Sequence, residues 1–123
     1  MNSQEEELLQ NAGIDIEEAL VRFSGNREIY EELLKEFLAD ANLNQLQIAL
    51  LEKDYQELFH RSHALKGISA NLSLNALYKQ LSQFVDLLRR QEFDSIESEY
   101  EEVIAVYHNT RSTLERYFAM RNQ

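Results

Sequence analysis

Apolar residues recur at steps of three and four along most of the chain, which is the spacing of one face of an α-helix. The pattern predicts a short helix over residues 15–23 and longer helices near residues 26–51, 54–72, 73–90 and 94–120. No stretch is the alternating run rich in Val, Ile and Thr that is typical of a β-strand. Because the predicted connections are short, successive helices are expected to be antiparallel neighbours. The sequence therefore predicts an all-α fold, an antiparallel up-down four-helix bundle with a short additional N-terminal helix.

The N-terminal half contains two points where the helical pattern is interrupted. Gly25 follows the first short helix and suits the left-handed conformation that often ends a helix. Around Asp40 the apolar pattern weakens, and either a kinked long helix or two helices with a tight joint would fit. Residues 1–12 are expected to form a flexible N-terminal tail, and residues 13–123 a single helical bundle domain.

Polar residues predict where the later helices begin. Asp54 is followed three residues later by Glu57, and Asp94 by Glu97, which is the spacing of a capping box. Ser73 is expected to be the N-cap of the helix that follows it, because its hydroxyl oxygen can accept a hydrogen bond from a free backbone N–H.

The helix predicted over residues 54–72 has a core face and a second, unusual face. Its core stripe has members three and four residues apart: Tyr55, Leu58, Ser62, Leu65, Ser69 and Leu72. At about 100° per residue, His63 lies roughly 140° away from that stripe. Lys66 and Gly67 follow one turn later on the side of His63. The pattern therefore predicts an imidazole, a cation and a residue without a side chain close together on the surface.

Glycine at position 67 is unexpected, because a glycine inside a helix costs about 0.5–1 kcal/mol relative to alanine. Gly67 either lets a neighbouring helix pack closely or leaves room for another molecule beside His63. The neighbouring Lys66 favours the second interpretation, and Ala70, one turn further on, would keep the same space open. Phe59, one turn before His63, either adds exposed apolar contact surface or turns inward to the core.

Composition narrows the function classes. The chain has 123 residues, of which 44% are hydrophobic and 28% charged, as expected for one globular domain. Its formal net charge of −10 argues against binding to nucleic acid or to an anionic membrane surface. Cysteine is absent, which excludes disulfides and thiolate chemistry. We find no signal peptide and no membrane span in the sequence, so a cytoplasmic protein is expected.

Cofactor sites are not expected either. His60 could pair with His63 as a metal ligand, but neither a carboxylate nor a third histidine is evident on the same helix face. The sequence also lacks the glycine-rich loops that hold nucleotide phosphates. We therefore expect no metal and no cofactor.

Residues 63–72 read His-Ala-Leu-Lys-Gly-Ile-Ser-Ala-Asn-Leu. This run resembles the signature of histidine-containing phosphotransfer (HPt) domains, roughly His-x-Leu-Lys-Gly-x-x-x-x-Leu-Gly, and the helical plan of residues 14–120 is similar to that of the family. The resemblance implies that an imidazole nitrogen of His63 is phosphorylated. It also implies exchange of that phosphoryl group with an aspartate of a receiver domain.

The sequence departs from the family pattern at two positions. Ser73 stands where a second glycine is usual, which should alter only a turn. Many members have a Gln or Glu near the imidazole on the next helix; the matching position is Val85, and Gln83 is the nearest polar candidate. Gln83 is therefore included with Phe59, Gly67 and Ala70 among the expected partner-binding residues.

The resemblance implies a free-standing phosphoryl carrier of a two-component phosphorelay, in which His63 accepts the phosphoryl group and Lys66 supports it electrostatically. Its expected partners are a response-regulator receiver domain and a hybrid sensor histidine kinase, and the carrier itself is expected to be a monomer. ATP-dependent kinase activity is not expected. The alternative is a non-catalytic helical adaptor that binds a protein partner and in which His63 is incidental.

Overall fold

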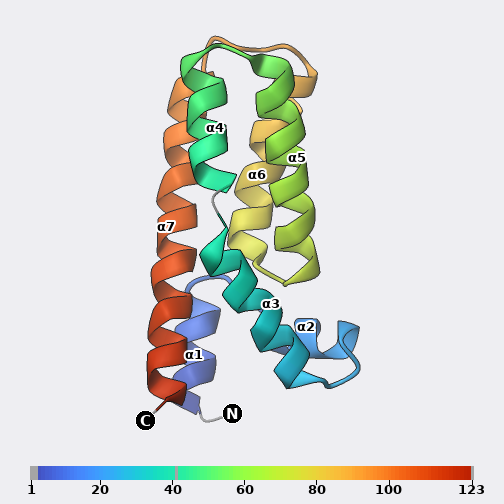
Figure 1. Cartoon of the computed structure of the whole chain (residues 1–123), viewed down its shortest axis with the longest axis vertical. Coiled ribbons are helices and arrows are strands. Elements are labelled where there is room, and N and C mark those ends of the chain that lie inside the picture. Colours follow the sequence, from blue (N-terminus) through green and yellow to red (C-terminus); the bar gives the residue numbers. More distant parts are fainter. Residues whose placement is uncertain (1–2, 41, 123) are drawn as a thin grey trace.

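The computed structural model describes residues 3–40 and 42–122, most of which are helical (Figure 1). Within these residues there is no strand, although Ile14 and Leu74 form an isolated antiparallel bridge. The all-α prediction is confirmed. The helices in chain order are α1 (Ser3–Asn11), α2 (Ile16–Arg22), α3 (Arg27–Ala39), α4 (Asn42–Leu51), α5 (Tyr55–Asn71), α6 (Asn75–Arg89) and α7 (Ile96–Arg121).

Helices α4, α5, α6 and α7 lie side by side, and the chain reverses direction at each connection between them (Figure 1). Helix α5 packs against α4 and α6, and α6 packs against α7. Helix α7 is the longest and extends past this bundle to contact α1 and α3. The interior is filled by apolar side chains that are almost fully buried: Leu46, Leu58, Leu65, Leu77, Leu81, Phe84, Val103, Tyr107 and Leu114.

The stretch over residues 26–51 forms two helices, which decides between the two arrangements that the sequence allowed. Helix α3 ends at Ala39, and the backbone of Asp40 is extended, with φ −76° and ψ 140°. The Asp40 carboxylate accepts a hydrogen bond of 2.9 Å from the backbone N–H of Asn42, the first residue of α4. One residue thus ends α3 and satisfies a free N–H group at the start of α4.

Helix α5 lies within one residue of its predicted boundaries and has the predicted core face, except that Tyr55 is only half-buried. It begins after Asp54, whose Oδ1 accepts a hydrogen bond of 3.1 Å from the backbone N–H of Glu57. Its buried stripe contains Leu58, Ser62, Leu65 and Ser69. The cap residue and the spacing of the apolar residues were sufficient to predict this helix, because one face of α5 packs against α4 and α6.

Ser73 is not an N-cap, so that prediction is wrong. The N-cap of α6 is Leu74, which makes no side-chain capping bond. The Ser73 hydroxyl is fully buried; it accepts a hydrogen bond of 2.9 Å from Arg22 Nη1 and donates one of 2.8 Å to Glu18 Oε1. Ser73 has a φ of 56°, in the left-handed region that favours glycine. Bonds to α2 therefore hold a serine in a glycine-like conformation.

The start of α7 also differs from the prediction. Asp94 does not cap the helix: the N-cap is Ser95, which makes no side-chain capping bond. The apolar stripe of α7 has a gap after Tyr107, where the buried residue one turn later is Thr110. A buried threonine thus accounts for the gap in the apolar stripe.

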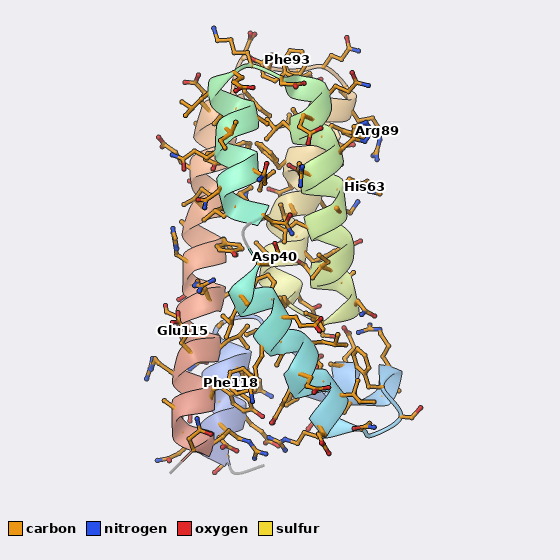
Figure 2. All side chains as sticks on the ribbon, in the orientation of Figure 1. Asp40, His63, Arg89, Phe93, Glu115 and Phe118 are labelled. Atoms are coloured by element: carbon orange, nitrogen blue, oxygen red, sulfur yellow. The ribbon has the colours of Figure 1, made fainter. Side chains whose placement is uncertain are left out.

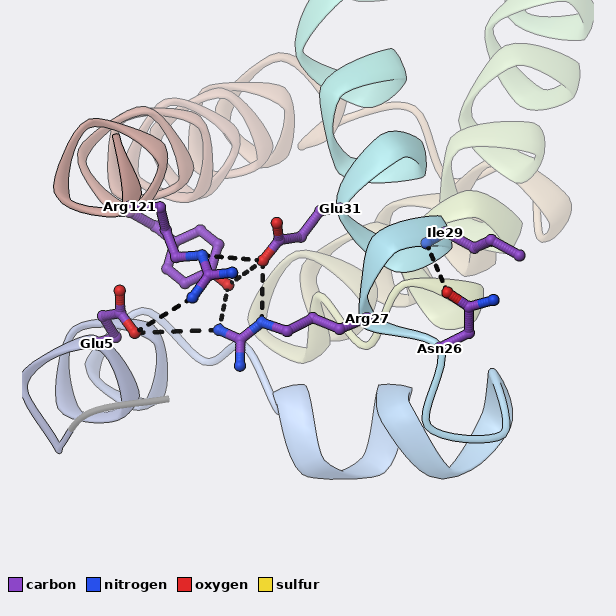
Figure 3. A network of polar contacts seen from close by, with 7 residues as sticks. Glu5, Asn26, Arg27, Ile29, Glu31 and Arg121 are labelled. Atoms are coloured by element: carbon purple, nitrogen blue, oxygen red, sulfur yellow. Dashed lines mark hydrogen bonds and ion pairs between the residues drawn. The ribbon is translucent and has the colours of Figure 1, made fainter. Parts of the chain in front are cut away.

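Residues 3–11 form a helix, where a flexible tail was expected; Met1 and Asn2 lie outside the described residues. Helix α1 packs against α7, and Leu9 is almost fully buried. The Glu5 carboxylate lies 4.0 Å from Arg27 of α3 and 4.0 Å from Arg121 of α7 (Figure 3). Apolar burial and charge together hold α1 in place, and the tail prediction missed both because the partners are distant in sequence.

The contacts in Figure 3 centre on Glu31, which accepts hydrogen bonds of 3.0 Å from Arg27 Nε and 2.6 Å from the Tyr117 hydroxyl. Burial alone would raise the pKa of Glu31, but the hydrogen bonds from Tyr117 and Arg27 and the charge of Arg121 outweigh it and lower that pKa. Burial, followed by the hydrogen bond to Glu31, raises the pKa of Tyr117 to about 12.

Candidate functional site

His63 lies on the solvent side of α5, away from the buried stripe, as the helical spacing predicts. Figure 2 shows it on the same side of the bundle as Arg89. Among residues 3–40 and 42–122 the imidazole has no hydrogen-bond or ion-pair partner; its ring contact is with Phe59, at 5.8 Å between ring centroids. The ring nitrogens are therefore open to a reaction partner.

Phe59 lies half-buried between the core and this exposed face. Its ring centroid is 5.7 Å from that of His60 as well as 5.8 Å from that of His63. The guanidinium carbon of Arg89, at the end of α6, lies 5.5 Å from the centroid of the Phe59 ring. Phe59 therefore contributes apolar surface beside His63 in addition to packing against the core.

Lys66 is half-buried one turn after His63. Its Nζ lies 5.8 Å from the ring centroid of Tyr78 on α6, and no carboxylate in the described part of the chain is within ion-pair distance. A cation over an aromatic face gains about 0.5–1 kcal/mol at an exposed site and keeps its full charge. The Tyr78 ring thus holds the Lys66 ammonium group in place, and no carboxylate of the described residues pairs with its charge.

Gly67 faces open space. A Cβ atom added there would meet no heavy atom of the described residues within 4 Å, its own helix backbone apart, whereas one added to Gly13 would lie 2.5 Å from the Cβ of Ala76. Close packing against a neighbouring helix therefore explains Gly13 and does not explain Gly67. Ala70, one turn beyond Gly67, is half-buried and adds little bulk to the same face.

The α6 residues expected near the imidazole do not provide a hydrogen bond to it. Val85 is fully buried in the bundle, and Gln83 is exposed. In the part of the chain that the structure describes, no hydrogen bond joins Gln83 to His63. The structure brings His63 together with Phe59 instead.

Sequence reasoning missed two residues beside the site. They are Arg89, whose charge is favourable at a helix C-terminus for local reasons alone, and Tyr78. Both lie on α6 and reach the site because α6 runs antiparallel to α5. Pairing the end of one predicted helix with the start of the other could have revealed Arg89.

The charges around His63 differ in sign from those of the whole chain. The chain has 22 acidic and 12 basic residues, yet two cations lie over aromatic rings on this face. Lys66 is one turn after His63, and Arg89 lies over the Phe59 ring that contacts His63. Neither has a carboxylate partner among the described residues. An exposed imidazole on a face that also carries these two cations is suited to bind and transfer an anionic group.

Residues 3–40 and 42–122 contain no group of three or more His, Cys, Asp or Glu side chains that could hold a metal ion. No helix within the described ranges is long and apolar enough to cross a membrane.

Comparison with protein families gives a match to the Hpt domain over residues 28–115. The matched region includes α4, α5 and α6 and ends inside α7, so it contains His63 and its neighbours. No curated protein and no solved structure matches the chain. Hpt domains are phosphoryl carriers in phosphorelay signalling rather than kinases. Because the match covers well over half of its length, the chain belongs to the Hpt domain family.

Proposed function

We propose that this chain carries a phosphoryl group on His63 in a multistep phosphorelay and exchanges it with the aspartate of a response-regulator receiver domain. A hybrid sensor histidine kinase, which would carry such a receiver domain, is the expected donor. The observation that carries the proposal is the exposed imidazole of His63, which has no hydrogen-bond partner in the described part of the chain, beside the open space at Gly67.

The transfer is a displacement at phosphorus. The lone pair of an imidazole nitrogen of His63 attacks the phosphorus of the aspartyl phosphate, and a P–N bond forms. The P–O bond to the aspartate breaks, and its electron pair leaves with the carboxylate. Transfer onward to a second aspartate is the reverse step. Since such reactions depend mainly on positioning and charge stabilisation, the carrier needs little covalent machinery of its own.

Lys66 and Arg89 would supply the charge stabilisation. Three equatorial oxygens share the negative charge of the transferring group, and a nearby ammonium or guanidinium group attracts them. The aromatic rings beneath both cations leave their charges available for this purpose. Gly67 and Ala70 would give the receiver domain the clearance that it needs to bring its aspartate to His63.

The test is incubation with a phosphorylated receiver domain, followed by detection of acid-labile, base-stable phosphate on the chain. The proposal predicts label on the wild type and none on His63→Gln. His60→Gln is the matched control, because His60 is also an exposed histidine of α5 and touches the same Phe59 ring. Label retained on His63→Gln would move the acceptor elsewhere. If none of a panel of receiver domains labels the wild type, the alternative function, a non-catalytic helical adaptor that binds a protein partner, would be favoured.

A further inference from the structure

A groove opens beside His63, between the first turns of α5 and the last turn of α6. Its volume is about 450 Å³. Three half-buried aromatic rings form much of its lining, a leucine and an arginine of α6 lie along one side, and a glutamine lies at the rim. The lining residues that matter here are Tyr55, Gln56, Phe59, Leu88, Arg89 and Phe93.

The aromatic wall of the groove is held in place by its own contacts. The rings of Tyr55 and Phe93 stack with centroids 4.0 Å apart and an angle of 11° between their planes. Phe59 continues the wall to His63, whose ring centroid is 5.8 Å away. Aromatic side chains fixed in this way lose little conformational freedom when a partner binds, so their apolar surface contributes efficiently to binding.

Arg89 is the charged residue among those lining the groove, and it is exposed. Nearby acidic groups are engaged elsewhere: Asp86 and Glu92 lie 3.6 Å and 3.5 Å from the guanidinium of Arg90. No carboxylate of the described residues lies within ion-pair distance of Arg89. In a chain with a net charge of −10, this groove is a local site where an acidic group is favoured.

A partner that reaches His63 has to cover the groove. Specific protein interfaces bury about 800 Å² on each partner, which extends well beyond one helical turn around a central residue. Phe59 lies one turn before His63 and belongs to the groove wall. We propose that this groove docks the receiver domain by accepting an apolar side chain of that domain beside a carboxylate that pairs with Arg89. This inference rests on the proposed function, since it names the partner that His63 would serve.

The test compares two substitutions that add the same charge in different places. Gln56 lies at the groove rim in the first turn of α5, and Gln45 lies in the first turn of α4, outside the groove; both are exposed. Single-turnover transfer is measured against receiver concentration, with a receiver domain that labels the wild type. We expect Gln56→Glu to raise the half-saturating concentration about twofold to fivefold, as one exposed charge pair would, without changing the maximal rate. Gln56→Lys should lower it, and Gln45→Glu should leave it unchanged.

Several outcomes would overturn the proposal. Equal effects of Gln56→Glu and Gln45→Glu would show that only overall charge matters. A lower maximal rate at an unchanged half-saturating concentration would assign the groove to the chemical step.

The same variants are also measured for binding to unphosphorylated receiver domains by calorimetry. If no receiver labels the wild type, the carrier role fails. In that case weaker binding by Gln56→Glu alone would still support the groove, and unchanged binding would refute it.

Discussion

Substitutions that add a side chain at position 67 should affect the free energy of unfolding and the rate of phosphoryl transfer differently. A Cβ atom there meets no described residue beyond its own helix backbone within 4 Å, so Gly67→Ala removes the glycine penalty without creating a clash. The expected gain is about 0.5–1 kcal/mol in the free energy of unfolding, because alanine restricts the unfolded chain and favours the helix. For a domain of this size the gain corresponds to a rise in Tm of about 2–5 °C.

Gly67→Gln tests the functional half of the same argument. Glutamine is also a good helix former, so this variant should be at least as stable as the wild type. Its side chain would occupy the space that we assign to the receiver domain. Transfer should then slow by about tenfold or more, since a displacement of about 1 Å between reacting groups can cost up to about 100-fold.

The assay combines denaturant unfolding, followed by far-UV circular dichroism, with single-turnover transfer from a phosphorylated receiver domain. Gly13→Ala is the control for a glycine that is required by packing. Its Cβ would lie 2.5 Å from the Cβ of Ala76 and its φ is 74°, so this variant should lose stability. Wild-type transfer rates in a stable Gly67→Gln variant would refute the reasoning, because the empty space would then serve no partner. A destabilised Gly67→Ala variant would refute the structural premise.

Three further predictions concern charge and buried polar groups. Lys66→Ala should slow transfer without abolishing it, because Arg89 remains; an unchanged single-turnover rate would remove Lys66 from the mechanism. Ser62→Ala should raise the free energy of unfolding by about 1 kcal/mol, because the Ser62 hydroxyl is buried without a hydrogen-bond partner among the described residues; a loss on denaturant unfolding would contradict this. The lowered pKa of Glu31 means that its contribution to stability is present above its unfolded pKa near 4.5 and is lost as pH falls through the lower folded pKa. Glu31→Gln should therefore flatten the acid side of the stability profile, and an unaltered profile would contradict the assignment.

Helix α5 was predictable because its signals are local. The Asp54 cap, the buried stripe and the exposed position of His63 all follow from residues within one helix. The same spacing placed Lys66 and Gly67 beside His63, so the centre of the candidate site could be proposed from sequence. The structure added that Gly67 has no neighbour to pack against, which spacing alone could not decide.

The errors lie where distant segments meet. Ser73 had the residue type of an N-cap, but Glu18 and Arg22 of α2 take its hydroxyl. Residues 3–11 had the composition of a tail, but α7 offers them an apolar surface and Arg121 an ion pair for Glu5. No pattern within either segment encodes these partners.

Arg89 shows the same limit at the site itself. It stands in the last turn of α6, and no pattern within that helix indicates its approach to Phe59 on α5. The structure also lacks the polar residue beside His63 that many family members carry on the next helix. Position 85, where the resemblance places that residue, holds a buried valine, and the exposed Gln83 makes no hydrogen bond to His63 in the described structure.

The central claim is that His63 carries the phosphoryl group, and the most direct test is to locate the phosphate after incubation with a phosphorylated receiver domain. Peptide mapping under alkaline conditions, which preserve phosphohistidine, should find it on His63 of the wild type and of His60→Gln, and on no residue of His63→Gln. Phosphate on any other residue of the wild type, or on a folded His63→Gln variant, would contradict the account.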